Sequence, residues 1–79
     1  MYYPETKMPI VAGAIFAQEM TTELTELTDR FKKKNIIVGR CIIANEFFGN
    51  EPVLIGNAVR VIGLRAIEAF LNNSYPDSI

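Results

Sequence analysis

The sequence predicts an all-α protein, a small helical bundle of two to three helices completed by homo-oligomerisation. One observation is a stripe of apolar and small residues that recurs every third or fourth position from Ile10 to Phe31, a spacing that keeps one face of a helix apolar. A second apolar arc runs from Ile55 to Phe70 in helical phase. Hydrophobic residues make up 49% of the 79 positions, which is rich for a body whose own core is small. Part of this apolar surface is therefore expected at a subunit interface.

The length predicts one domain over residues 1–79. A formal net charge of −1 and scattered basic residues make nucleic acid an unexpected partner. The single cysteine, Cys41, excludes an intrachain disulfide, fits a reducing compartment and, among apolar neighbours, is expected to be buried. No apolar run reaches the roughly 20 residues of a membrane span, and the first residues lack the basic start of a signal peptide. The expected location is the cytoplasm.

The first predicted element is a long helix over residues 9–34, after an extended lead-in at 1–8. Pro9 suits a first helical turn, where its missing N–H costs nothing. Three consecutive lysines from Lys32 place positive charge near the helix C-terminus, where the dipole is negative. A competing interpretation makes Pro9 to Ala17 a buried strand followed by a shorter helix. The continuous phase of the stripe favours one helix.

The segment 36–48 fits either a helix or a strand. Its β-branched residues favour a strand, whereas Ile37, Cys41, Ala44 and Phe48 keep a spacing of four, three and four. A helix is favoured because a single unpaired strand would leave both edges exposed. The alternative is an α+β fold in which residues 36–44 form a strand.

The last predicted helix covers residues 51–72 and leads into a polar tail at 73–79. Gly49 can end the preceding element and Asn50 can cap the helix. This helix is apolar on two sides, which is typical of a helix between two partners. Together with the seam of the first helix, this predicts an oligomer or partner interface at Met20, Leu24, Leu27, Phe31, Val53, Leu64 and Leu71.

A few polar residues are candidates for holding a small anion. Arg65 lies at the edge of the apolar arc, where a guanidinium requires a carboxylate, a phosphate or a ring. Its partner is either a ligand or a glutamate, Glu68 or one from the first helix. Tyrosine rings can stack on a nucleobase and a lysine can hold a phosphate. The candidate ligand-binding residues are Tyr2, Tyr3, Lys7, Arg60 and Arg65.

The sequence predicts no catalytic, metal or cofactor site, because the chain contains no histidine and its cysteine lacks a base. Glu19, Glu23 and Glu26 share one predicted helical flank, where solvated carboxylates are expected. The predicted function is a non-enzymatic helical binding protein that self-assembles and regulates or inhibits another protein by direct binding. The alternative is a homo-oligomer that holds a small anionic ligand, such as a nucleotide, between subunits.

Overall fold

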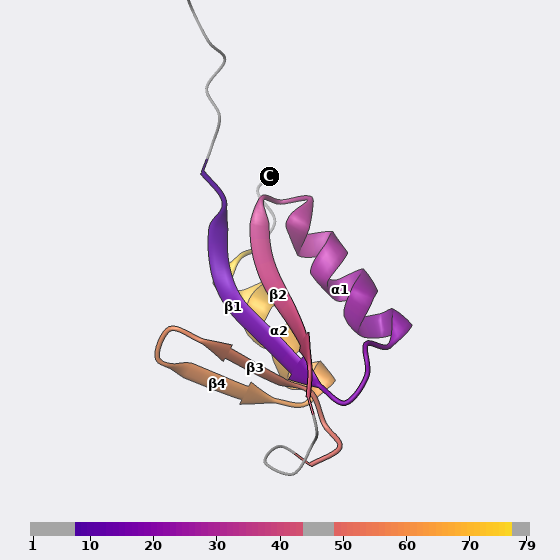
Figure 1. Ribbon diagram of the computed structural model, residues 1–79. Coiled ribbons are helices and arrows are strands. Elements are labelled where there is room, and N and C mark those ends of the chain that lie inside the picture. Colours follow the sequence, from indigo (N-terminus) through magenta and orange to yellow (C-terminus); the bar gives the residue numbers. More distant parts are fainter. Residues whose placement is uncertain (1–7, 44–48, 77–79) are drawn as a thin grey trace, which may run out of the picture.

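The computed structural model describes residues 8–43 and 49–76 and shows an α+β fold. Its elements in chain order are β1 (Ile10–Ala17), α1 (Thr22–Lys32), β2 (Ile36–Ile42), β3 (Val53–Gly56), β4 (Val59–Ile62) and α2 (Leu64–Ser74). The strands form one mixed sheet in the order β2-β1-β3-β4 (Figure 1). The predicted all-α fold class is therefore wrong. The alternative, an α+β fold with a strand within residues 36–44, is the one the chain adopts.

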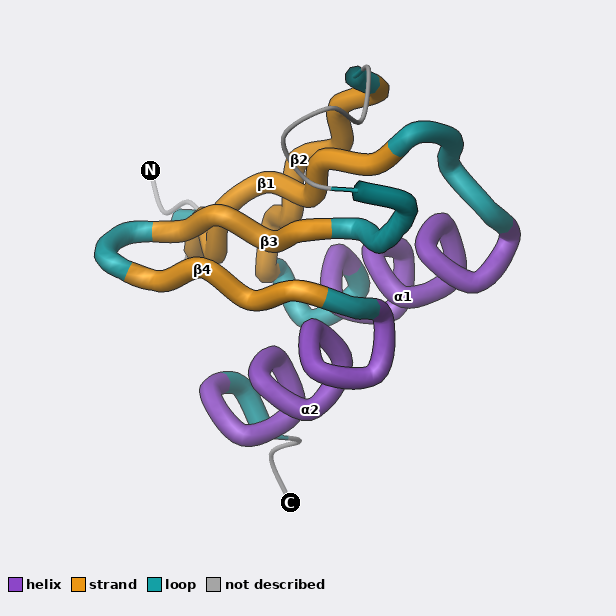
Figure 2. Tube along the Cα trace, turned by 90° about the horizontal axis from the view of Figure 1, so that it is seen from below, coloured by secondary structure: helices purple, strands orange, loops and turns teal. Residues whose placement is uncertain are grey.

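One face of the sheet carries both helices. β1 and β2 are parallel and connected through α1, whereas β3 pairs antiparallel with β1 and forms a hairpin with β4. Both helices lie on the same side of the strands (Figure 2). Leu27 and Phe31 of α1 and Ile67 of α2 join Ile15 and Leu54 of the sheet in one buried core. The molecule thus has two layers, with helices over one sheet face only.

The predicted helix over residues 9–34 is wrong at its N-terminal part, where β1 forms instead. β1 is a central strand, so its backbone groups are paired on both sides, with β2 and with β3. A strand whose two faces are both apolar reads as a continuous apolar run, which periodicity cannot distinguish from a buried helix. The helix begins after Thr21, whose hydroxyl accepts the Leu24 N–H at 3.2 Å, a typical N-cap. The competing interpretation, a strand followed by a shorter helix, is the one observed.

The predicted helix over residues 51–72 is also wrong, because its first half forms the β3–β4 hairpin. Gly56 pairs with Val59 across a two-residue turn in which Ala58 has a φ of 67°. Gly63, with a φ of 101°, then separates β4 from α2. Alternate residues of a strand point to opposite sides. Val53, Ile55 and Ile62 therefore share one face of the hairpin, whereas Leu64 and Leu71 belong to α2.

The backbones of β1 and β3 approach closely where both strands carry glycine. The pairing of β1 with β2 shifts between Val11 and Gly13, leaving Ala12 as an irregularity. A Cβ atom on Gly13, which has a φ of 141°, would lie 2.5 Å from the Ile55 carbonyl oxygen. A Cβ atom on Gly56 would lie 2.6 Å from the Ala12 carbonyl oxygen. No side chain fits at either position without moving a strand.

We expect Gly13→Ala to lower the free energy of unfolding by about 2–4 kcal/mol, because it combines an unfavourable φ with a backbone clash. Gly39→Ala in β2 is the matched control, since its Cβ would lie 3.4 Å from the Ala14 Cβ, an ordinary contact. Urea unfolding followed by circular dichroism measures both. An equal decrease in the free energy of unfolding for the two variants would show that the close approach of β1 and β3 is not the cause.

Candidate functional site

The sheet face turned away from the helices is built almost entirely from apolar side chains, and we call it the open face. Its members follow from the strand register, because paired residues of neighbouring strands point to the same side. They are Val11, Ala14, Phe16, Ile37, Gly39, Cys41, Val53, Ile55, Arg60 and Ile62. Arg60 alone among these residues is charged, and it lies on the edge strand β4.

Several apolar residues of the open face are exposed to solvent. Val11 is 72% exposed, Ile62 51% and Ile55 37%. A sheet face that contacts only water normally carries polar side chains at such positions. Val53, in the same row as Ile62, is fully buried although it lies outside the helix-side core. An exposed apolar surface of this kind marks a candidate interaction site.

Cys41 is exposed, so the expectation that it is buried is wrong. Its neighbours Ile42 and Arg40 are exposed as well, whereas Ile36 and Val38 earlier in β2 belong to the helix-side core. The C-terminal part of β2 therefore extends beyond the buried core. The apolar sequence context of Cys41 reflects the composition of a strand and not the burial of the thiol.

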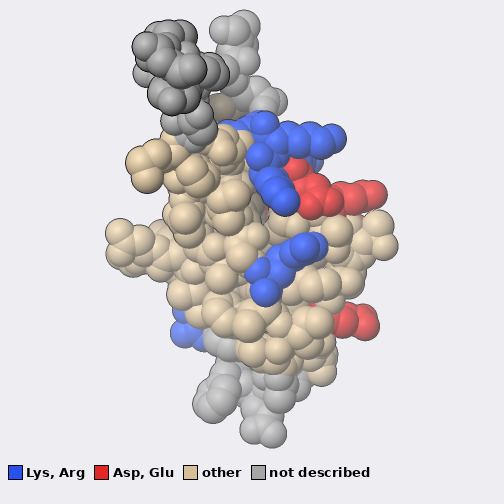
Figure 3. Space-filling view, turned by 45° about the horizontal axis from the view of Figure 1, so that its top comes forward, with Lys and Arg blue, Asp and Glu red and all other residues tan. Residues whose placement is uncertain are grey.

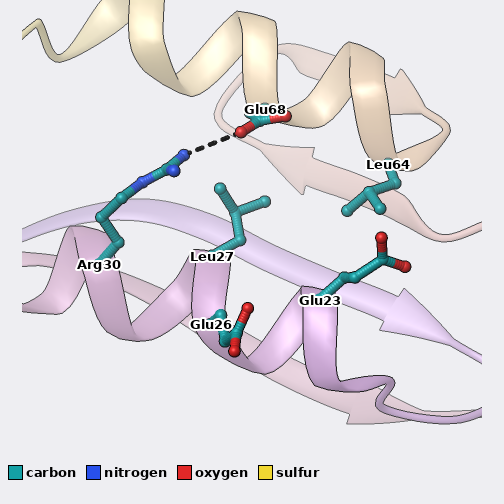
Figure 4. Close-up of a pocket in the computed structure, with 6 residues that line it drawn as sticks. All are labelled: Glu23, Glu26, Leu27, Arg30, Leu64 and Glu68. Atoms are coloured by element: carbon teal, nitrogen blue, oxygen red, sulfur yellow. Dashed lines mark hydrogen bonds and ion pairs between the residues drawn. The ribbon is translucent and has the colours of Figure 1, made fainter.

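A groove of about 390 Å³ lies between the two helices (Figure 4). Its lining residues are Glu23, Glu26, Leu27, Arg30, Leu64 and Glu68. The Arg30 Nη2 atom donates to Glu68 Oε2 at 3.2 Å across the groove, with side chains 49% and 46% exposed. An exposed pair of this kind contributes at most about 1 kcal/mol.

The charged side chains that line the helix groove are mainly acidic. Its lining combines three carboxylates with one guanidinium. The excess negative charge would repel an anionic ligand. Within residues 8–43 and 49–76, no group of three histidine, cysteine or acidic side chains is placed to hold a metal ion. In the same part of the chain, no helix is long and apolar enough to cross a membrane.

The predicted ligand-binding residues are not brought together in the structure. Tyr2, Tyr3 and Lys7 lie outside the described residues. Arg60 belongs to the open face, whereas Arg65 is exposed on α2, which packs on the other side of the sheet. Glu68, the suggested partner of Arg65, pairs with Arg30 of α1.

The residues predicted to form an oligomer interface lie inside the fold or against its core. Five of them are buried within the chain: Leu24, Leu27, Phe31, Val53 and Leu71. Met20 and Leu64 are partly buried and pack against the core. These contacts account for the apolar pattern without a second subunit, so homo-oligomerisation stays a prediction.

Val11, Ile55 and Ile62, the exposed apolar residues of the open face, were not among the sequence candidates, because a helical period was applied to strand residues. The short runs Val53–Gly56 and Val59–Ile62 flank only two residues, Asn57 and Ala58. Two short β-rich runs separated by two residues, with glycine and asparagine at the junction, are typical of a β-hairpin. Applied here, that pattern gives the alternation that places Ile55 and Ile62 on one face.

No protein-family model, curated protein or solved structure matches this chain. The geometry of its surfaces is therefore the basis on which its function is inferred.

We expect the Cys41 thiol of the folded protein to react fully with N-ethylmaleimide, because the residue is exposed on the open face. Intact-mass spectrometry under native buffer conditions measures one added label, and Cys41→Ser provides the unlabelled control. Labelling that requires denaturant would contradict the exposure of this residue.

Proposed function

We propose that this chain is a small non-enzymatic α+β binding protein that regulates or inhibits another protein by contact through the open face. The exposure of Val11, Ile55 and Ile62 on one apolar sheet face supports this function. The centres of protein interfaces are apolar and poor in charged residues, and their rims are polar. The open face is similarly poor in charge, and its one charged residue, Arg60, lies on the edge strand β4.

The size of the open face indicates a weak, transient complex. At about 4.8 Å between strands and about 3.3 Å per residue, the four strands cover roughly 360 Å² in projection. A standard interface buries about 800 Å² of each partner. A partner that contacts the open face alone is therefore expected to dissociate readily, as regulatory partners often do.

The other predicted features enter this proposal with different support. Self-assembly through the open face competes with this proposal, because a second copy would occupy the surface that the other protein needs, and the solution mass tests it directly. The nucleotide alternative gains nothing from the geometry, because Arg60 and Arg65 lie on opposite sides of the sheet. We place the protein in the cytoplasm, where an exposed single thiol such as Cys41 stays reduced.

We expect the double variant Ile55→Asp/Ile62→Asp to lose its partner. Two carboxylates on the face would have to be desolvated in the complex, which should weaken binding at least about tenfold. The wild-type chain and the variant are used to capture proteins from source cells, quantified by mass spectrometry. The captured protein is then purified, and its dissociation constant for each chain is measured.

Ala66→Asp is the matched control, because it adds the same charge at an exposed position of α2, away from the open face. The proposal requires a protein that wild type and control bind equally and the double variant does not. Circular dichroism shows whether all three chains are folded. Retention of the same partner by the double variant, or a stable homodimer that covers Ile55 and Ile62, would contradict the proposed function.

A further inference from the structure

The outer edge of β2 presents unpaired backbone groups. β2 is the first strand in the sheet order, so within the described residues no strand pairs with its outer side. The Asn35 carbonyl accepts the Ile10 N–H, and the Ile43 N–H donates to the Ala17 carbonyl, both at 3.0 Å. The odd-numbered residues of β2 therefore face β1, since backbone groups alternate in direction along a strand. The outward groups are those of Ile36, Val38, Arg40 and Ile42.

β2 has few of the features that protect natural sheet edges from pairing. Such edges are usually short, bulged, or marked by proline and by several charges. β2 has seven residues without proline, and its one charged residue is Arg40. The β-bulge between β1 and β2 lies at Ala12 of β1, so the backbone of β2 itself is regular. The opposite edge strand, β4, has only four residues. β2 is therefore the edge that can accept another strand.

A groove of about 410 Å³ runs between this edge and α1. Thr28, Asp29 and Lys32 of α1 form one wall, and the residues from Ile37 to Arg40 form the other. An unpaired sheet edge can bind an extended peptide by strand addition, and the groove beside it can hold alternate side chains of that peptide. Backbone hydrogen bonds supply the affinity of such sites, and alternate side chains supply the specificity.

The β2 edge of a second copy does not fit this site. Paired strands lie about 4.8 Å apart, whereas packed helices need about 8–10 Å between their axes. α1 packs directly on β2, and the Arg40 Nη1 atom reaches the Thr25 Oγ1 atom at 3.5 Å. A second β2 would bring its own α1 too close to the first. The occupant is therefore a strand with no helix over it.

We propose that the β2 edge and its groove bind an extended segment of another protein, in which apolar and acidic residues alternate. Side chains of the added strand that face α1 would lie near Lys32, Arg40 and Asp29. Two of these three charged residues are basic, which favours acidic side chains in the added strand. The hydrogen bond from Arg40 to Thr25 is long, at 3.5 Å, and leaves other guanidinium donors for an acidic side chain. Side chains on the other side of the strand lie next to Ile37 of the open face, which favours apolar residues.

The preference for an acidic segment rests on the groove itself, where Lys32 and Arg40 outnumber Asp29 among the lining residues. Figure 3 shows a largely uncharged surface on which the upper group of Lys and Arg side chains has Asp and Glu side chains directly beside it. This second surface goes beyond the proposed function of the open face, and the two are tested with different variants.

The probe is a random ten-residue peptide library displayed on phage and selected on the purified chain. Enriched peptides are expected to alternate apolar and acidic residues. Their dissociation constants, measured by fluorescence anisotropy, should rise about fivefold or more in Lys32→Glu, because the charge facing the peptide is reversed. Lys33→Glu is the matched control, since Lys33 is exposed and does not line the groove, and should change binding less than about twofold.

Amide hydrogen exchange followed by NMR gives a readout that a distant binding site would not produce. The N–H groups of Ile37, Gly39 and Cys41 should exchange slowly in the free chain, and those of Val38, Arg40 and Ile42 rapidly. Peptide binding should slow the second set. Arg40→Pro removes one outward N–H and should abolish binding, whereas Ile55→Asp/Ile62→Asp on the open face should not affect it.

Three results would overturn the proposal, and none depends on Arg40→Pro remaining folded. The first is that no peptide is enriched. The second is that Lys32→Glu and Lys33→Glu bind an enriched peptide equally, with the exchange of Val38 and Arg40 unchanged. The third is a homodimer in sedimentation in which these amides are already protected. If Ile55→Asp/Ile62→Asp loses the protein partner but still binds the peptide, the open face and the β2 edge are two independent binding surfaces.

Discussion

The close approach of the β1 and β3 backbones is the constraint on which the rest of the structure depends. β1 is the central strand, and β3 connects the hairpin and α2 to it. Gly13 and Gly56 allow the contact, because a Cβ on either would lie within 2.6 Å of a carbonyl oxygen. This contact sets the pairing of Ile15 with Leu54, and both residues lie in the core beneath the helices. Without it, the N-terminal unit and the C-terminal unit would share no sheet.

The two faces of this sheet are unequal. The helix side is closed by fully buried residues from every layer, among them Ile15, Phe31 and Ile67. The link between the helices themselves, Arg30 with Glu68, is exposed and adds little, so packing on the sheet holds both helices in place. The open face is equally apolar but partly exposed. Among the described residues, three of the six exposed large hydrophobic side chains, Val11, Ile55 and Ile62, lie on this face, where binding would bury them.

The open face and the β2 edge form one continuous region. Ile37, Gly39 and Cys41 belong both to the open face and to the edge strand. A protein that adds a strand to β2 would widen the sheet, and its apolar side chains would extend the open face. The hydrogen bonds of strand pairing would then supplement the small apolar area, because area alone sets affinity poorly. A partner that contacts both surfaces would have a lower dissociation constant than a partner that contacts only one of them.

The sequence by itself determined the elements whose signals are local. The spacing of Leu24, Leu27 and Phe31 identified the seam that α1 buries, and the β-branched run after Asn35 raised the strand alternative for β2. Only the tertiary structure decided that Ile10–Ala17 is a strand and that residues 53–62 form a hairpin.

The physical reason is that these segments are apolar on two sides, which suits a buried helix as well as a strand inside a sheet. β1 becomes a strand because β2 and β3 supply its hydrogen bonds. Both are distant in the sequence, so no local pattern contains that information. The open face could not be predicted from the sequence for the same reason, because Ile55 and Ile62 share a face only if their segments are strands. The absence of histidine and the single cysteine could be read directly, since they depend on composition and not on conformation.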